Sequence, residues 1–165
     1  MCKLFLVAGI LVFSTMAMAQ QKGSGDSSAD VFVGYSVLNG NTLSTASGLE
    51  ASLNGHVTNW LGLKADLSGN WGSGGHVYNV LFGPQVTHHI DKLDLFGHGL
   101  LGVSRFHIPG ASSTGVGWEL GGGADWNLGH RFAIRVAQLD YHGSHLFGAT
   151  QRDFRYSTGI VFHLK

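Results

Sequence analysis

Eight short segments of the sequence alternate apolar and polar residues with a period of two, and this pattern decides the fold class. The segments span residues 30–38, 47–57, 60–71, 76–88, 93–105, 115–127, 131–141 and 153–164. Such alternation is typical of β-strands whose two faces meet different surroundings. No segment has the three-to-four residue periodicity of a long amphipathic helix. The sequence therefore predicts an all-β chain. The alternation alone also fits a soluble sandwich, and we predict an eight-stranded antiparallel up-and-down barrel from where the charges lie.

The placement of charges distinguishes a membrane barrel from a soluble one. In four segments one face carries no Asp, Glu, Lys or Arg; its residues are Leu49, Ala51, Leu53, Val57, Leu61, Leu63, Ala65, Leu67, Val116, Trp118, Leu120, Ala124, Trp126, Phe154, Tyr156, Thr158, Ile160, Phe162 and Leu164. A soluble lipocalin-like binder, which is one alternative, would place its charges outside. We assign the uncharged face to lipid, because a closed barrel also pairs every backbone group, as hydrocarbon requires. In segments 30–38 and 93–105 the pattern does not indicate which face points outward.

The N-terminus has the three parts of a cleavable secretory signal peptide. Lys3 supplies a positive charge, residues 4–13 form an apolar run, and Ala17-Met18-Ala19 forms an A-x-A cleavage site. An apolar run of about ten residues is half of what a membrane-spanning helix needs. We expect residues 1–19 to be removed on export, residues 20–29 to form a flexible leader and residues 30–165 to form a barrel in the outer membrane.

The connections between segments predict which way the barrel faces. Those after the second, fourth and sixth segments are short, at residues 58–59, 89–92 and 128–130, whereas residues 39–46, 72–75, 107–114 and 142–152 read as mostly longer polar loops. Short turns on the periplasmic side and longer loops outside are typical of outer-membrane barrels. Both chain ends then fall on the periplasmic side.

Two positions interrupt the strand pattern. The seventh segment changes phase at Ala137-Gln138, which predicts a β-bulge. Pro84 removes a backbone donor from a strand that has no free edge, and we interpret it as a second bulge.

Several segments resemble small outer-membrane β-barrels similar to the transmembrane domain of outer-membrane protein A. They are Phe82-Gly83-Pro84-Gln85, Leu101-Gly102-Val103-Ser104-Arg105, Gly121-Gly122-Gly123-Ala124-Asp125, Arg135-Val136-Ala137-Gln138-Leu139-Asp140-Tyr141 and 155–162. Ser157, Gly159, Phe162 and Leu164 also resemble the C-terminal signal that the barrel-assembly machinery reads, although the chain ends in Leu164-Lys165 instead of Phe. The resemblance implies a structural or surface-interaction protein whose partners are outer-membrane lipid and lipopolysaccharide, with an unknown surface ligand.

The polar face carries charges of both signs, which are Glu50, Lys64, Asp66, Glu119, Asp125, Arg131, Arg135, Asp140 and Arg155. Confined opposite charges must pair to offset the cost of leaving water. An eight-stranded barrel is just wide enough for side chains to fill, so we expect a network of ion pairs and no wide pore. Arg135, Asp140 and Arg155, on the last two segments, are the best candidates for part of this network, and a small gated channel is the alternative.

Catalytic, metal and nucleic-acid functions have weaker support. His142-Gly143-Ser144 resembles the His-x-Ser of lipid A deacylases, but no acid that would orient the imidazole is evident. His142 and His145 with His107, all expected in outer loops, could bind a metal loosely, without the fixed ligand spacing of a structural site. The formal net charge is zero, which argues against nucleic acid. We predict neither an enzyme nor a cofactor, with a barrel enzyme that modifies outer-membrane lipid as the runner-up.

Overall fold

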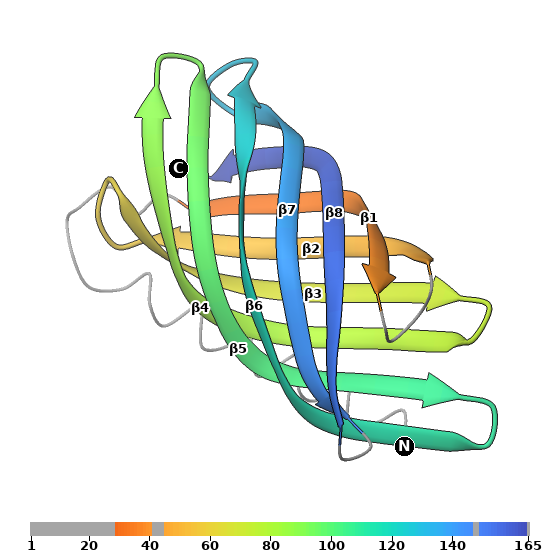
Figure 1. Ribbon diagram of the computed structural model, residues 1–165. Coiled ribbons are helices and arrows are strands. Elements are labelled where there is room, and N and C mark those ends of the chain that lie inside the picture. Colours follow the sequence, from red (N-terminus) through yellow and green to blue (C-terminus); the bar gives the residue numbers. More distant parts are fainter. Residues whose placement is uncertain (1–28, 41–44, 147–148, 165) are drawn as a thin grey trace.

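The chain forms one closed antiparallel β-barrel in a computed structural model, which describes residues 29–40, 45–146 and 149–164 (Figure 1). The strands are β1 (Ala29–Gly40), β2 (Ala46–His56), β3 (Leu61–Gly72), β4 (Gly75–Ile90), β5 (Leu93–Ile108), β6 (Ala111–Asn127), β7 (Phe132–Leu146) and β8 (Ala149–Leu164). Each strand pairs with the next, and β1 pairs with β8. The predicted fold class and strand count are confirmed.

The pairing of β1 with β8 gives the barrel two ends. Ala29 lies opposite Leu164, so the first and last described residues share one end, which we name the terminal end. The opposite end, where the hairpins β3–β4 and β5–β6 turn, is named the distal end. The predicted signal peptide and residues 20–28 of the predicted leader lie outside the described residues, whereas Ala29, assigned to the leader, begins β1. In the part of the chain that the structure describes, no helix has the length and apolarity needed to cross a membrane.

The expected long loops at the distal end are wrong for two of the four connections. Strands β5 and β6 continue to Ile108 and Ala111, and only Pro109 and Gly110 join them. Gly110 has a φ of 88°, which a glycine adopts without strain. Strands β7 and β8 likewise continue to Leu146 and Ala149. These polar segments extend the ladder beyond the length that a bilayer needs, since strands β4 to β8 have 15 to 17 residues.

The alternation in the sequence maps onto the two faces of the barrel wall as predicted. Outward residues such as Phe82, Leu101 and Leu120 are 69%, 62% and 63% exposed. Strands β1 and β5, whose faces the pattern left open, also alternate. Their inward positions include Phe32, Leu38, Phe96 and Leu100, all buried. Both faces of these two strands carry apolar residues, so the sequence does not show the alternation of apolar and polar residues there.

One of the two predicted irregularities is confirmed. The β6–β7 register shifts by one residue, because Ala124 pairs with Ala137 but Asp125 pairs with Arg135. The extra residue turns Gln138 into the interior. Pro84 does not cause a bulge: the β4–β5 register is the same on both sides of it, from Phe82 opposite Leu101 to Gln85 opposite His98. The outward-facing proline interrupts the ladder without shifting it.

The interior is layered along the barrel axis. A cluster of buried apolar side chains, Phe32, Ala133 and Val161, lies toward the terminal end. A second cluster, Leu38, Ala46 and Val77, packs with Phe106 toward the distal end. Most of the buried charged side chains lie in the interior between these two levels, so apolar groups separate them from both openings. The exceptions are Asp94, at the terminal end, and Asp153, which lies opposite Gly40 toward the distal end. This arrangement holds the ionic groups away from bulk water and makes the interior a packed core.

Candidate functional site

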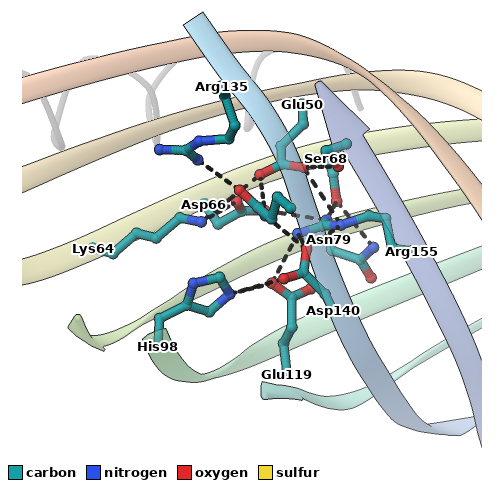
Figure 2. Close-up of polar contacts among 12 residues, drawn as sticks. Glu50, Lys64, Asp66, Ser68, Asn79, His98, Glu119, Arg135, Asp140 and Arg155 are labelled. Carbon is teal, nitrogen blue, oxygen red and sulfur yellow. Dashed lines mark hydrogen bonds and ion pairs between the residues drawn. The ribbon is translucent and has the colours of Figure 1, made fainter. Parts of the chain in front are cut away.

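Arg155 of β8 is the centre of the charged interior (Figure 2). It is 1% exposed, and its guanidinium lies among carboxylates of four other strands. Its Nη2 donates to Oε1 of Glu119 at 2.8 Å, and its Nε donates to Oδ2 of Asp140 at 3.1 Å. Its Nη1 lies 3.4 Å from Oδ1 of Asp66 on β3, and its Nε lies 3.5 Å from Oε2 of Glu50 on β2. We name Arg155, Lys64 and these four carboxylates the central cluster.

Lys64, the second cation of the central cluster, is held more loosely than Arg155. Its Nζ lies 3.5 Å from Oδ2 of Asp66 and 3.8 Å from Oε1 of Glu50. The ammonium donates no hydrogen bond to either carboxylate, although the side chain is buried. A compact ammonium lacks the planar fork that lets a guanidinium serve several carboxylates at once. Arg155 therefore provides most of the ordering in the cluster.

Gln138, which the bulge turns inward, connects the central cluster to a second ion pair. Its Nε2 donates to Oδ2 of Asp140 at 2.6 Å and to Oε1 of Glu50 at 2.9 Å. Its Oε1 accepts a hydrogen bond of 2.6 Å from Nη1 of Arg135. Arg135 in turn binds Asp125 through two hydrogen bonds of 2.8 and 2.9 Å. An amide can donate to carboxylates and accept from a guanidinium, so it suits this position.

Arg135 also stacks between two aromatic rings. Its guanidinium carbon lies 4.1 Å from the ring centroid of Phe32 and 4.2 Å from that of Phe96. Cation–π contacts at these distances stabilise a desolvated guanidinium. The Arg135–Asp125 pair is therefore neutral as a pair and packed on both faces, and it adds no net charge to the interior.

Two histidines that sequence analysis did not place in the interior face the central cluster. Nε2 of His98 on β5 lies 3.3 Å from Oε1 of Glu119 and 3.2 Å from Oδ1 of Asp140. Nδ1 of His142 lies 3.6 Å from Oε2 of Glu119, and its Nε2 lies 3.4 Å from Oγ of Ser104. Both histidines are buried. The one signal in the sequence is their position in the alternation, since each lies an even number of residues from other inward residues of its strand.

The glycine at position 121 makes room for this arrangement. A Cβ built there would meet Oδ1 of Asp140 and the carbonyl oxygen of Leu139. Gly121 lies opposite Asp140 in the β6–β7 ladder. The Gly121-Gly122-Gly123 triplet thus lies within a strand, where the missing side chain of Gly121 leaves space for a buried carboxylate.

The structure places eight of the nine predicted interior charges in the barrel, namely Glu50, Lys64, Asp66, Glu119, Asp125, Arg135, Asp140 and Arg155. The exception is Arg131, whose inward assignment is wrong. It precedes β7 in the turn at the terminal end and is exposed. The predicted segment 131–141 begins one residue before β7, so a turn residue falls at a position predicted to be inward.

The proposed histidine sites in the outer loops also need correction. His142 and Ser144 lie on β7 and both point into the interior, so the His142-Gly143-Ser144 triplet is not in a loop. The hydroxyl nearest to His142 belongs to Ser104. His145 and His107 are exposed, and His107 stacks with His76 at a centroid distance of 6.1 Å. His142 is therefore separated from the two histidines with which it was grouped.

The terminal end carries a second set of His and Asp contacts that sequence analysis missed. Asp30 lies 2.7 Å from Nδ1 of His163 and 3.4 Å from Nε2 of His56. Nε2 of His163 lies 3.1 Å from Asn127, whose Nδ2 donates to Asp94 at 2.8 Å. The residues come from five strands, so these bonds tie the mouth of the barrel together.

Comparison with known proteins identifies the fold. No protein-family model and no curated protein sequence matches the chain. The solved structure of Ail, the attachment invasion locus protein of Yersinia pestis, matches with a TM-score of 0.56 and 17% identity, over 85% of this chain and 100% of that chain. Neisserial surface protein A (NspA) matches with a TM-score of 0.66 and 13% identity, over 86% and 99% of the two chains.

A third match is the N-terminal β-barrel domain of Pseudomonas aeruginosa OprF, with a TM-score of 0.56 and 11% identity, over 86% of this chain and 100% of that domain. Ail has also been solved in complex with the heparin analogue sucrose octasulfate. At these identities the likeness concerns the fold. The chain has the closed eight-stranded architecture of small outer-membrane barrels, as the sequence resemblance implied.

Proposed function

We propose that this chain is a bacterial outer-membrane protein with a structural or surface-interaction role and a closed interior. The observation that carries the proposal is the distribution of charge across the barrel wall. Among the described strand residues, the outward positions hold no Asp, Glu or Lys, and their two arginines, Arg105 and Arg152, lie near the distal end. All other charges of the strands occupy inward positions. A wall of this kind suits hydrocarbon outside and a packed polar core inside.

The distal end would face the cell exterior, with the terminal end in the periplasm. Aromatic side chains on the outer wall support a membrane position, since Trp71 and Tyr78 lie toward the distal end and Trp126 lies toward the terminal end. Bands of aromatic residues at both interfaces are a general property of membrane barrels.

The basic character of the distal end suggests what this surface would contact. Arg105 and Arg152 are exposed there with His76, His107 and His145, and the described part of the distal end holds no exposed carboxylate. Guanidinium groups bind phosphate and sulfate through paired hydrogen bonds. Lipopolysaccharide phosphates are the partner we favour. The complex of the fold relative Ail with a heparin analogue is consistent with an anionic ligand.

The interior argues for a structural role over a channel or an enzyme. The central cluster fills the barrel at mid-height, and apolar clusters lie above and below it. The contact between His142 and Ser104 is buried, with an exposed fraction of 1% for the histidine and 0% for the serine. A deacylase would need these groups at an accessible rim. We therefore propose neither catalysis nor wide-pore conduction.

Export and assembly are the parts of the proposal that rest on sequence. Residues 1–19 would direct export and be cleaved, residues 20–29 would form the leader, and residues 30–165 would form the barrel. Ser157, Gly159, Phe162 and Leu164 would be read by the barrel-assembly machinery. Within β8, Phe162 and Leu164 are outward-facing and Ser157 is buried.

Membrane fractionation tests the main proposal. The expressed protein should sediment with outer membranes, resist carbonate extraction and migrate differently on a gel with and without boiling. A mature protein that stays soluble without detergent would contradict the proposal and support a lipocalin-like binder.

Binding to vesicles that contain lipopolysaccharide tests the surface role. The double variant Arg105→Gln, Arg152→Gln should bind dephosphorylated and phosphorylated lipopolysaccharide equally, whereas the unchanged protein should prefer the phosphorylated form. Arg131→Gln at the terminal end is the matched control and should behave as the unchanged protein. Lipid A of unaltered mass in cells that overproduce the protein would exclude the deacylase alternative.

A further inference from the structure

The charges of the central cluster do not balance. Its four carboxylates, Glu50, Asp66, Glu119 and Asp140, carry four negative charges when ionised, and Lys64 and Arg155 supply two positive ones. The neighbouring pair of Arg135 with Asp125 is already neutral. All of these groups are buried, and an uncompensated charge in a low-dielectric interior is costly. The cluster therefore requires two further positive charges, from protons or from a cation.

Three metal-binding side chains converge at one edge of this cluster. His98, Glu119 and Asp140 come from β5, β6 and β7, and one ligand atom of each lies within 4.8 Å of the other two. Figure 2 shows the imidazole of His98 directed at the carboxylates of Glu119 and Asp140. The three side chains are at most 4% exposed.

The spacing of the donor atoms fits direct coordination. Nε2 of His98 lies 3.2 Å from Oδ1 of Asp140 and 3.3 Å from Oε1 of Glu119. Ligands held at the usual zinc bond lengths in a tetrahedral site lie about 3.3–3.5 Å apart. One imidazole N–H could also approach both oxygens at these distances, so the spacing alone does not distinguish a metal from a proton.

Unpartnered oxygens provide the second observation. Oδ1 of Asp140 and Oε2 of Glu119 are buried and accept no hydrogen bond among the described residues, whereas the other oxygen of each carboxylate is bonded to Arg155. Arg155 thus holds both carboxylates and leaves Oδ1 of Asp140 available beside Nε2 of His98. The free oxygen of Glu119, Oε2, lies beside Nδ1 of His142 instead. A buried carboxylate oxygen without a donor is uncommon in a native interior and calls for an explanation.

We infer that the barrel interior holds one divalent transition-metal ion of the zinc class, bound by Nε2 of His98 and by the carboxylates of Glu119 and Asp140. A single divalent cation supplies the two missing positive charges of the central cluster. An imidazole among the ligands favours zinc, cobalt or nickel over calcium and magnesium, which prefer oxygen ligands alone. His142 lies 3.6 Å from the same Glu119 carboxylate and acts as a positioning residue.

The location of the site predicts how it is loaded. Apolar side chains lie between the cluster and each end of the barrel, so the ion enters while the strands assemble and does not exchange readily afterwards. A surface site behaves in the opposite way. His76 and His107 are stacked on the exposed outer wall and provide the obvious competing site, accessible at any time.

The test is refolding of the mature chain, without a polyhistidine tag, from urea into detergent micelles. One sample refolds with Zn²⁺ or Co²⁺ and is then treated with a chelator, and a second refolds with the chelator and receives the metal afterwards. Metal per chain is measured by mass spectrometry after gel filtration, and the Co²⁺ absorption spectrum reports the coordination geometry.

We expect one ion per chain in the first sample and none in the second. His98→Gln should retain no metal in either order while still showing heat-modifiable mobility, and His107→Gln, the matched control, should behave as the unchanged protein. If His98→Gln does not fold, the order-of-addition experiment on the unchanged protein still decides the question.

Two results would overturn the inference. In the first, the unchanged protein retains no metal after folding in the presence of the metal; in the second, His107→Gln loses the metal and His98→Gln keeps it. The first result would mean that protons balance the cluster, and the second that the metal binds the surface.

Discussion

Replacement of Arg155 by methionine tests whether the central cluster depends on a single cation. Methionine keeps the unbranched apolar part of the side chain and removes the guanidinium with its charge. In the folded barrel the change leaves Glu50, Asp66, Glu119 and Asp140 with Lys64 as the one cationic side chain of the central cluster, and Lys64 is close to two of the four. The guanidinium also donates to Oγ of Ser68 at 2.7 Å, so a hydrogen bond is lost as well.

The magnitude follows from the desolvation of the carboxylates. Removal of one partner from a buried ion pair costs roughly 3–5 kcal/mol, because the remaining charge stays in a low-dielectric interior. Arg155 serves four carboxylates at 2.8 to 3.5 Å, so we place the loss in the free energy of unfolding at the upper end, about 5 kcal/mol. A second change, Glu119→Gln, removes one of the unpaired charges and should recover part of this loss.

Urea unfolding in detergent micelles, followed by tryptophan fluorescence, measures these free energies. Arg131→Met is the matched control, because Arg131 is exposed at the terminal end and should contribute less than about 0.5 kcal/mol. A loss for Arg155→Met below about 1 kcal/mol would refute the reasoning. So would additivity of Arg155→Met and Glu119→Gln, since two side chains 2.8 Å apart must couple.

Three further predictions concern the wall of the barrel. Leu101→Arg, at mid-height on the outer face, should lower the free energy of unfolding in lipid vesicles by about 2–4 kcal/mol, whereas Leu128→Arg, in a turn at the terminal end, should lower it by at most about 1 kcal/mol. Gly159→Val should lower it by about 1–3 kcal/mol in the same assay, because a Cβ at this position would meet the backbone of Gly34 and a ring carbon of Phe32 at 2.9 Å. Phe162→Ser should reduce the amount of barrel assembled in outer membranes, measured by heat-modifiable mobility, while refolding of the purified chain into micelles changes much less.

The strands and their faces could be predicted from the sequence because the two sides of the wall have opposite chemistry. A period of two was visible wherever the inward residues are polar, as at Lys64 and Asp66 in β3. It was hidden where the interior is apolar, as at Phe32 in β1 and Phe96 in β5. The missing pattern in those strands therefore reflects the layering of the core.

The distal hairpins were mistaken for loops for a related reason. Residues 107–114 contain Pro109, Gly110 and three hydroxyl residues at 112–114, a composition typical of turns. A strand that extends beyond the apolar part of the wall has no apolar face to mark it. The structure shows that His107 pairs with Ser112 and Ile108 with Ala111, so the ladder continues almost to the turn. Backbone pairing does not depend on an apolar outer face, and the sequence pattern indicates only the part of a strand that has one.

The histidines illustrate what strand parity can and cannot provide. His98 and His142 share the inward face with Glu119 and Asp140, but a lone histidine among ten has no spacing that marks it as interior. Their meeting depends on the closure of β5, β6 and β7 around a common axis. Such a convergence of residues far apart in sequence requires the three-dimensional fold.

The central cluster also bears on how the barrel selects its closing register. Arg155 belongs to the last strand, and its partners Asp66, Glu119 and Asp140 come from β3, β6 and β7, so the cluster can form only after β8 has joined the wall. A slip of β8 by one residue would turn Arg155 to the outer face of the wall and bring Phe154 or Tyr156 among the carboxylates. Both errors are costly: in the membrane that we propose, the first exposes a charge to hydrocarbon, and the second leaves four carboxylates without their main cation. The buried charges therefore favour a single register of closure, a constraint that an apolar core would impose less strictly.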